Sequence, residues 1–475
     1  MTMKFMAYSC RGGRVSTLTR GRWHVAAVPR RTVGLRAGTA LVDGLSALGL
    51  DEELMEKNVT YLRDGCVVAK GGIKKGDTIL SVAERVWVTR GVVEKESGLM
   101  ESYSGVKDLD TWIVLALFLL YEQVTKETMW AGYVGGLMDD VSVDVPILWK
   151  DDDVAMLQGT QIADSVVSYK NFFVQTYQNL VAEGVLDENF PGDEDGFVKA
   201  ACIVRGCSHA PLTGEQLALV PGIEGLQYKK IGANSVLDLQ SGLFGGQKSL
   251  AVKAIGNVEE GEAITFDVAP ECTQGHVLLN HGMIDTNAPG TFAITLVLPE
   301  DDTFYDDKID ILELNGLQSS AEFILQTGAP PPETMLAMLR LINLDNADAF
   351  LLESIFRNEV WGHVNLPVSE ENERAVYESM ASGCASVLQS YPNKLEEDIA
   401  LLKSLPEDAV HARMAVALRL GEKEVLEATL RFFEDRLGLL KDLEYYGERR
   451  LKRLGLLDKE GKPTDWDSFF DDGIA

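Results

Sequence analysis

Three short stretches of the chain carry the side chains best suited to chemistry. They read R-G-C-S-H (205–209), E-G-L-Q-Y (224–228) and L-L-N-H-G-M (278–283). His281, in the last of these, is of the residue type that can orient an amine or accept its proton near neutral pH. A lone histidine in an apolar stretch is also a common structural residue, so the sequence leaves both interpretations open.

Strand and turn signals surround these stretches. Residues 58–90 alternate short β-branched runs with glycine-bearing turns, a pattern typical of β-hairpins. One unit occurs twice, as I-K-K-G-D (73–77) and V-E-E-G-E (258–262). Its apolar residue, charged pair, glycine and acid predict two strands that begin in the same way.

Between these units the pattern changes to that of helices. Asp108 or Asp110 is a candidate N-cap for a helix whose apolar face includes Trp112, Leu115 and Leu119. The longest apolar run belongs to this helix and has roughly half the length that a membrane span needs. The sequence therefore predicts no membrane span.

Further helices are expected on both sides of the chemical stretches. A second one is predicted from about 162 to 183, and the acidic segment 184–197, with its Pro-Gly pair, is predicted as a surface loop. From 333 onward the pattern is helical almost to the end. Its clearest part is a helix with apolar residues at three- and four-residue steps from 410 to 440.

The charge balance and the cysteines limit the function classes. A net charge of -29 argues against a general nucleic-acid surface, because phosphate binding relies on clustered Lys and Arg. The six cysteines form no C-x-x-C pair. This pattern favours free thiols over disulfides or zinc ligands, and we predict no metal site.

The two ends of the chain differ from the middle. Residues 1–42 are rich in Arg and contain no Asp or Glu, a composition typical of an organelle transit peptide. A basic disordered tail is the alternative. The final segment 457–475 combines acids with Trp466, Phe469 and Phe470, and the sequence does not decide between a docked and a mobile tail.

The stretch F-L-L-E-S-I-F-R-N-E-V-W-G-H-V-N-L-P-V-S-E-E-N-E (350–373) closely resembles the C-terminal domain of the plastid Rubisco large-subunit methyltransferases. This family also includes fructose-bisphosphate aldolase methyltransferases. Further matches are W-A-G-Y-V-G-G-L (130–137), D-V-P-I-L-W (144–149) and L-R-L-G-E-K (418–423). The resemblance spans about 58–456. It implies an α+β fold, with a β-rich SET domain, a helical insert and an all-α C-terminal substrate-binding domain.

This resemblance gives expected domain bounds and a location. The domains are a transit peptide over 1–42, a SET domain over 43–300 with a helical insert at about 105–197, an all-α substrate-binding domain over 301–456 and an acidic, aromatic tail over 457–475. The leader then indicates the chloroplast stroma, with the mitochondrion as the runner-up.

The family transfers a methyl group from S-adenosylmethionine (AdoMet) to a protein lysine, and aligning the two reactants supplies much of the catalysis. By position, the resemblance implies a catalytic role for His281. It implies cofactor contacts for Asp64, Gly65, Cys66, Arg205, Gln227 and Tyr228.

The chain departs from the family at each of these places. Asp64 and Cys66 replace two turn glycines, Cys207 replaces a cofactor arginine, Gln227 and Tyr228 replace an Asn-His pair, and His281 and Phe266 replace two tyrosines. Period-two alternation would place Arg205 on the same strand face as Cys207 and let it substitute. Cys207 itself is expected to be a packing residue.

Two functions therefore stay open. One is a divergent AdoMet-dependent protein-lysine N-methyltransferase that acts on a plastid protein. The other is a catalytically inactive SET-fold scaffold or subunit of a plastid protein complex, for which a transcription or nucleoid assembly is one setting. In both, the C-terminal helical domain binds the protein partner, and no direct nucleic-acid binding is expected.

Overall fold

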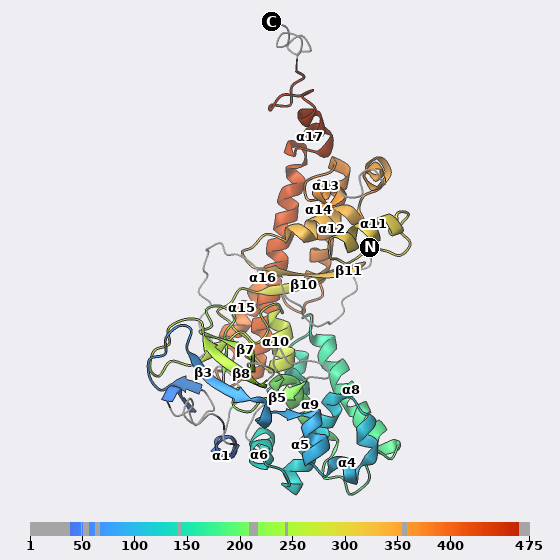
Figure 1. The fold of residues 1–475 in the computed structure, drawn as a ribbon. Helices are drawn as coiled ribbons and strands as arrows, with labels where there is room; N and C mark the ends of the chain where they lie inside the picture. The colour runs from blue at the N-terminus through green and yellow to red at the C-terminus, as the bar shows by residue number, and fades with distance from the viewer. Residues whose placement is uncertain are drawn as a thin grey trace.

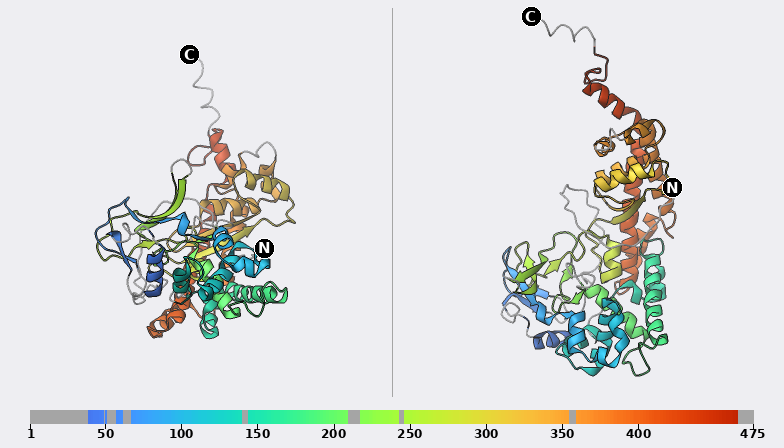
Figure 2. Two further views of the ribbon diagram at one scale, coloured as in Figure 1. Left: turned by 60° about the horizontal axis from the view of Figure 1, so that its bottom comes forward. Right: turned by 45° about the vertical axis from the view of Figure 1, so that its right-hand side comes forward.

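The computed structural model describes residues 39–48, 50, 57–61, 67–139, 144–208, 217–242, 246–353 and 359–464. The predicted leader lies mostly outside these ranges, and so does the tail from residue 465. The described chain forms two lobes (Figure 1). Helix α16 (Val410–Gly438) runs along both of them, as the second view in Figure 2 shows.

Short strands form the sheets of the first lobe. They are β1 (Val59–Tyr61), β2 (Val67–Ala69), β3 (Thr78–Ala83), β4 (Val88–Thr89), β5 (Ala218–Leu219), β6 (Gln227–Tyr228), β7 (Ser235–Gly242), β8 (Gly246–Ala254) and β9 (Thr265–Phe266). The largest sheet is antiparallel with the order β3-β8-β7, β1 pairs with β2, and β4 pairs with β5. Strands β6 and β9 are parallel. The predicted hairpin in 58–90 is confirmed by the β1–β2 pair.

The two copies of the repeated unit lie against each other. The backbone N–H of Ile73 donates to the carbonyl of Val258, and that of Val258 donates to Ile73, both at 2.9 Å. Gly76 and Gly261 adopt φ values of 94° and 76°, which only glycine reaches without strain. The acid of each unit accepts from the backbone N–H three residues earlier, at 3.0 Å in both. The predicted similarity of the two units is confirmed.

The first lobe also contains helices. They are α1 (Thr39–Ala47), α3 (Arg90–Glu96), α4 (Leu99–Ser102), α5 (Thr111–Thr125), α6 (Ala131–Asp139), α7 (Asp151–Ala155), α8 (Ala163–Ala182), α9 (Glu194–Cys207) and α10 (Gln274–His281), with 3-10 turns at Glu84–Val86, Ser104–Asp108 and Pro146–Leu148. The predicted helices after Asp110 and over 162–183 are confirmed by α5 and α8. Helix α5 is buried on all sides, which explains its long apolar run. No helix in the described ranges is long and apolar enough to span a membrane.

Helix α9 corrects two of the sequence predictions. Residues 194–197, predicted as part of a loop, form its first turn, and residues 205–207, predicted as strand, form its last. The Asp193 carboxylate caps the helix by accepting from the Gly196 N–H at 2.8 Å, and acids are favourable in a first helical turn. Arg205 and Cys207 are therefore two residues apart on a helix and do not share a face.

The second lobe is mainly helical. It contains β10 (Thr291–Val297), β11 (Ser320–Gln326), α11 (Tyr305–Leu314), α12 (Glu333–Ile342), α13 (Val360–Val364), α14 (Glu370–Leu388), α15 (Leu395–Ser404), α16 and α17 (Tyr446–Arg453), with 3-10 turns at Asn346–Leu352 and Leu440–Asp442. The expected helices from 333 onward are confirmed. The antiparallel β10–β11 pair is an addition that the helical periodicity did not indicate.

Helix α16 belongs to the cores of both lobes. Met414 and Leu418 pack in the core of the first lobe, whereas Leu426 and Phe433 pack in the core of the second. Polar contacts add to this junction, since Glu422 accepts from the backbone N–H of residue 161 at 3.3 Å. The two lobes are thus joined by shared apolar packing as well as by the chain.

Glu422 makes the stability of this junction depend on pH. Its carboxyl is buried and accepts from the Tyr391 hydroxyl at 2.6 Å. Burial raises the pKa of Glu422 from 4.5 to about 8, although the bond from Tyr391 opposes the rise. A raised carboxyl pKa means that the folded state retains a proton that the unfolded state has released. This contribution to stability is present below the unfolded pKa and is lost as the pH rises through the folded pKa.

We expect Glu422→Gln to remove that loss. Relative to the wild type, the variant should gain about 2 kcal/mol in free energy of unfolding between about pH 6 and about pH 9. Urea unfolding at the two pH values measures the difference, and Glu434→Gln, at an exposed position of the same helix, is the control. Equal pH dependence in the variant and the wild type would contradict a buried, protonated Glu422.

Candidate functional site

Arg205, in the last turn of α9, is fixed from two sides. Its Nε donates to the Asn280 Oδ1 at 2.5 Å, and its guanidinium carbon lies 3.7 Å from the centroid of the Tyr169 ring. Among the described residues, its two terminal nitrogens make no hydrogen bond or ion pair. The result is a positioned cation whose fork is available for a carboxylate, the group that arginine binds best.

His281 is the last residue of α10 and lies against the end of α9. Its Nδ1 is 2.9 Å from the carbonyl oxygen of Gly206. A carbonyl only accepts, so Nδ1 carries the proton in the neutral ring and the lone pair is on Nε2. Burial lowers the pKa of His281 to about 4, and the charge of Arg205 adds to this effect. At neutral pH the ring is therefore uncharged and held in one tautomer.

Gln227 and Tyr228 form β6, next to Thr265 and Phe266 of β9. The Tyr228 ring is buried, and its hydroxyl has no hydrogen-bond partner among the described residues. Burial raises the pKa of this hydroxyl, so it stays protonated. A buried hydroxyl without a partner costs about 1–3 kcal/mol, which a bound group that accepts a hydrogen bond from it would recover.

The loop after β9 is tied to the segment after β6. Lys230 Nζ pairs with Asp267 at 3.2 Å and donates to the carbonyls of Ala269 and Pro270 at 2.9 and 2.7 Å. The backbone N–H of Lys230 donates to Asp285 at 3.0 Å, and the Gln274 side-chain amide of α10 also bonds the backbone there. These bonds link β6 and β9 to the helix that ends in His281.

The first lobe also buries an acid, Glu224, and a thiol, Cys207. Glu224 accepts from the Tyr133 hydroxyl and, at 2.8 Å, from the Gly222 N–H, and burial raises its pKa to about 7. Cys207 is fully buried, which raises the pKa of its thiol and leaves it a packing residue rather than a nucleophile. Cys272 is disulfide-bonded, which corrects the expectation of a free thiol at this position, whereas Cys202, Cys207 and Cys384 are free thiols as expected.

The structure brings some of the candidate residues together. Arg205 and His281 meet at the α9–α10 contact, joined by Asn280 and by the Gly206 carbonyl, whereas Gln227 and Tyr228 lie on the neighbouring strand. Asp64, Gly65 and Cys66 lie outside the described residues. Asn280 and Tyr169, which hold Arg205, were not among the predicted site residues. Asn280 directly precedes His281, but nothing in the sequence pairs Tyr169 with α9.

Comparisons with known proteins identify the family of the chain. The family model described as Rubisco LSMT substrate-binding matches residues 299–426. The chloroplastic Rubisco large subunit N-methyltransferase of Nicotiana tabacum is 35% identical over 84% of this chain and 82% of its own length. The chloroplastic fructose-bisphosphate aldolase-lysine N-methyltransferase of Arabidopsis thaliana is 31% identical over 85% of this chain and 84% of its own length.

Solved structures show the same fold. The SET domain of LSMT bound to lysine and AdoHcy has a TM-score of 0.72 and 30% identity, over 89% of this chain and 97% of that one. Rubisco LSMT bound to AdoMet has a TM-score of 0.71 and 30% identity, over 89% and 98%. The predicted fold class, a SET domain followed by a substrate-binding domain, is confirmed. The chain belongs to the family of the Rubisco large-subunit and fructose-bisphosphate aldolase lysine N-methyltransferases.

Proposed function

We propose that the protein is a divergent AdoMet-dependent protein-lysine N-methyltransferase. The observation that carries this proposal is Arg205, whose guanidinium is fixed by Asn280 and Tyr169 beside His281 while its terminal nitrogens stay unpaired among the described residues. A guanidinium held in this way is suited to bind an anionic ligand through its terminal nitrogens. The family and the two relatives support the same activity.

The described residues fit part of the cofactor. AdoMet has a carboxylate, which the fork of Arg205 would hold through two charge-assisted hydrogen bonds. Tyr228 supplies a buried hydroxyl that lacks a partner among the described residues, and Gln227 adds an amide on the same strand. When bound, AdoMet supplies a methyl group attached to a positively charged sulfur.

His281 is suited to orient the acceptor amine rather than to store its proton. In its neutral ring, with Nδ1 directed at Gly206, the lone pair is on Nε2, the atom that would accept a hydrogen bond from an amine N–H. A pKa of about 4 is too low for a base that must hold a proton near neutral pH. The lysine amine would therefore release its proton to solvent before it reacts.

We further propose a plastid protein as the substrate, bound by the second lobe. Support comes from the substrate-binding family match and from the chloroplastic relatives.

Helix α1 packs on α6 where Gly44 meets Gly132, and a Cβ on Gly44 would lie 2.4 Å from the Gly132 backbone. A cut at residue 42 would divide this packed helix, so we place the end of the leader before Thr39.

One observation favours the second candidate function, an inactive scaffold or complex subunit. The family's cofactor arginine is replaced by Cys207, which is fully buried, and Phe266 in β9 carries no hydroxyl. Under this alternative the chain retains the fold and the protein-binding lobe but transfers no methyl group.

Methyl transfer from labelled AdoMet to Rubisco, aldolase and a plastid extract distinguishes the two functions. We expect transfer by the wild type and an about 10- to 100-fold lower rate for His281→Ala, because losing an acceptor that orients the amine costs about 1.4–2.7 kcal/mol. Cofactor affinity should change less than about threefold, a shift of under about 0.7 kcal/mol. His276→Ala, on the same helix, is the control. Equal transfer by the wild type and His281→Ala would show that His281 does not orient the acceptor amine. No transfer by the wild type would favour the scaffold function.

A further inference from the structure

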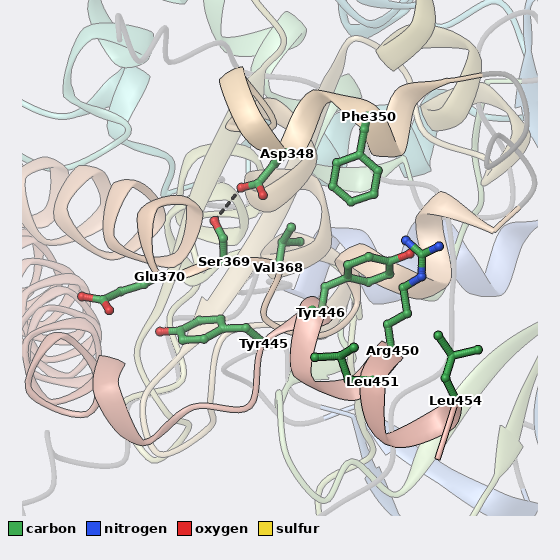
Figure 3. Close-up of a pocket in the computed structure, with 11 residues that line it drawn as sticks. Asp348, Phe350, Val368, Ser369, Glu370, Tyr445, Tyr446, Arg450, Leu451 and Leu454 are labelled. Atoms are coloured by element: carbon green, nitrogen blue, oxygen red, sulfur yellow. Dashed lines mark hydrogen bonds between the residues drawn. The ribbon is translucent and has the colours of Figure 1, made fainter. Parts of the chain in front are cut away.

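A groove of about 680 Å³ lies in the second lobe, far along the chain from the site above. It is bounded by the 3-10 turn Asn346–Leu352, the start of α14 and helix α17. Its lining residues are Asp348, Phe350, Val368, Ser369, Glu370, Tyr445, Tyr446, Gly447, Arg450, Leu451 and Leu454 (Figure 3).

The groove has apolar side chains, and two of them are exposed to solvent. Phe350 and Tyr446 pack against each other with ring centroids 5.7 Å apart. On α17, Leu451 is 40% exposed and Leu454 is 57% exposed. Figure 3 shows both leucines on the same helix as Arg450, on the Tyr446 side of the groove. Leucines this exposed beside two aromatic rings form an apolar surface with no cover among the described residues.

The unpaired charge at this groove is positive. Asp348 accepts from the Ser369 hydroxyl at 2.5 Å, and Glu370 pairs with Arg374 at 2.7 Å, so both lining acids are satisfied. Arg450 lines the groove and Arg453 follows it one turn later on α17. Neither guanidinium makes a hydrogen bond or an ion pair with a described residue.

The end of the chain has the complementary composition. Residues 465–475 read D-W-D-S-F-F-D-D-G-I-A, with four acids, three aromatic rings and no Lys or Arg. The aromatic residues, at 466, 469 and 470, have the spacing that places side chains on one face of a helix.

The described chain also ends beside the groove. The backbone N–H of Thr464 donates to the carbonyl of Leu456 at 3.2 Å, two residues after Leu454 of the groove lining. An extended residue spans about 3.3 Å, so the remaining segment can reach about 35 Å from this point, more than the groove requires. Attachment to the same chain gives the segment an effective concentration on the order of millimolar at the groove.

We propose that segment 465–475 of the same chain docks in this groove, its aromatic rings covering Leu451 and Leu454 and its carboxylates pairing with Arg450 and Arg453. Part of the groove lining, including Val368 and Ser369, lies within residues 299–426, which match the substrate-binding family model. A docked tail therefore withholds this part of the second lobe from a protein partner.

Hydrogen exchange on the full chain tests the proposal. Comparing the wild type with the triple variant Trp466→Ala/Phe469→Ala/Phe470→Ala, we expect backbone amides of 445–454 to exchange at least about 10-fold faster in the variant, because docking suppresses local opening of α17. Ser468→Ala is the matched control in the same segment. Unchanged exchange in the triple variant would overturn the proposal.

A second variant tests the charges separately. Arg450→Glu/Arg453→Glu should raise the exchange of the same amides to a similar extent and increase the rate at which carboxypeptidase removes the tail. Equal digestion of the wild type and this variant would overturn the pairing. Protection that disappears on dilution would also overturn the proposal, because it would mean that the tail docks on a second copy of the chain.

Discussion

Asp398→Ala is expected to lower the free energy of unfolding by about 3–5 kcal/mol. Asp398 lies on α15 with no exposed surface, and its two carboxylate oxygens pair with Arg419 and Lys423, both at 2.5 Å. Both cations are almost fully buried. Removing the carboxylate leaves two charges inside the lobe, and each must then lose its hydration without an ionic partner.

The effect should reach the junction between the lobes. Arg419 also donates to the carbonyl of Met156, which belongs to the first lobe. Denaturant unfolding of Asp398→Ala measures the loss, with Glu396→Ala, at an exposed position of the same helix, as the control. A loss below about 1 kcal/mol, within the range of exposed ion pairs, would show that the buried pairs do not hold the helices together.

Arg205→Ala is expected to weaken AdoMet binding by about 10- to 100-fold. In the proposed function the Arg205 guanidinium binds the carboxylate of AdoMet, and hydrogen bonds to charged groups contribute about 1.5–3 kcal/mol. Because its contacts with Asn280 and Tyr169 involve Nε and the ring face, the fork keeps its direction without help from the ligand. Most of the lost affinity should therefore come from the missing cation rather than from a moved backbone.

Two variants separate charge from geometry in this experiment. Arg205→Lys keeps the charge but not the fork, so its affinity should lie between those of the wild type and the alanine variant. Lys170→Ala removes a cation next to Tyr169 that has no assigned role at the cofactor. Equal affinity of Arg205→Ala and Lys170→Ala for AdoMet would refute the role of Arg205.

The long elements of this fold were predictable because their signals are local. Helices α5, α8 and α16 follow from apolar periodicity, and the paired turns follow from a repeated five-residue unit. Helix α9 was not predicted, because its start was expected to be a loop and its end a strand. Its first turn contains acidic residues, which are common in loops but also stabilise a helix N-terminus. Its last turn contains Gly206 and Cys207, which have low helix propensity.

The site was predictable only where a motif fixes a position. His281 is the last residue of α10, and Gln227 and Tyr228 form β6, whereas their roles at a site stay predictions. The environment of Arg205 was not predictable, because Tyr169 approaches it from another helix and only tertiary packing sets that contact. The pKa of His281 likewise depends on burial, which the sequence around it does not reveal.

Calorimetric titration of AdoMet into the chain tests the central claim most directly. If Arg205 and Tyr228 complete a cofactor site, the wild type should bind AdoMet with a dissociation constant on the order of micromolar, or about -8 kcal/mol. The Arg205→Ala variant should bind at least about 10-fold more weakly. No heat and no thermal stabilisation of the wild type at about millimolar AdoMet, where a micromolar ligand would stabilise the fold by about 4 kcal/mol, would contradict the methyltransferase function.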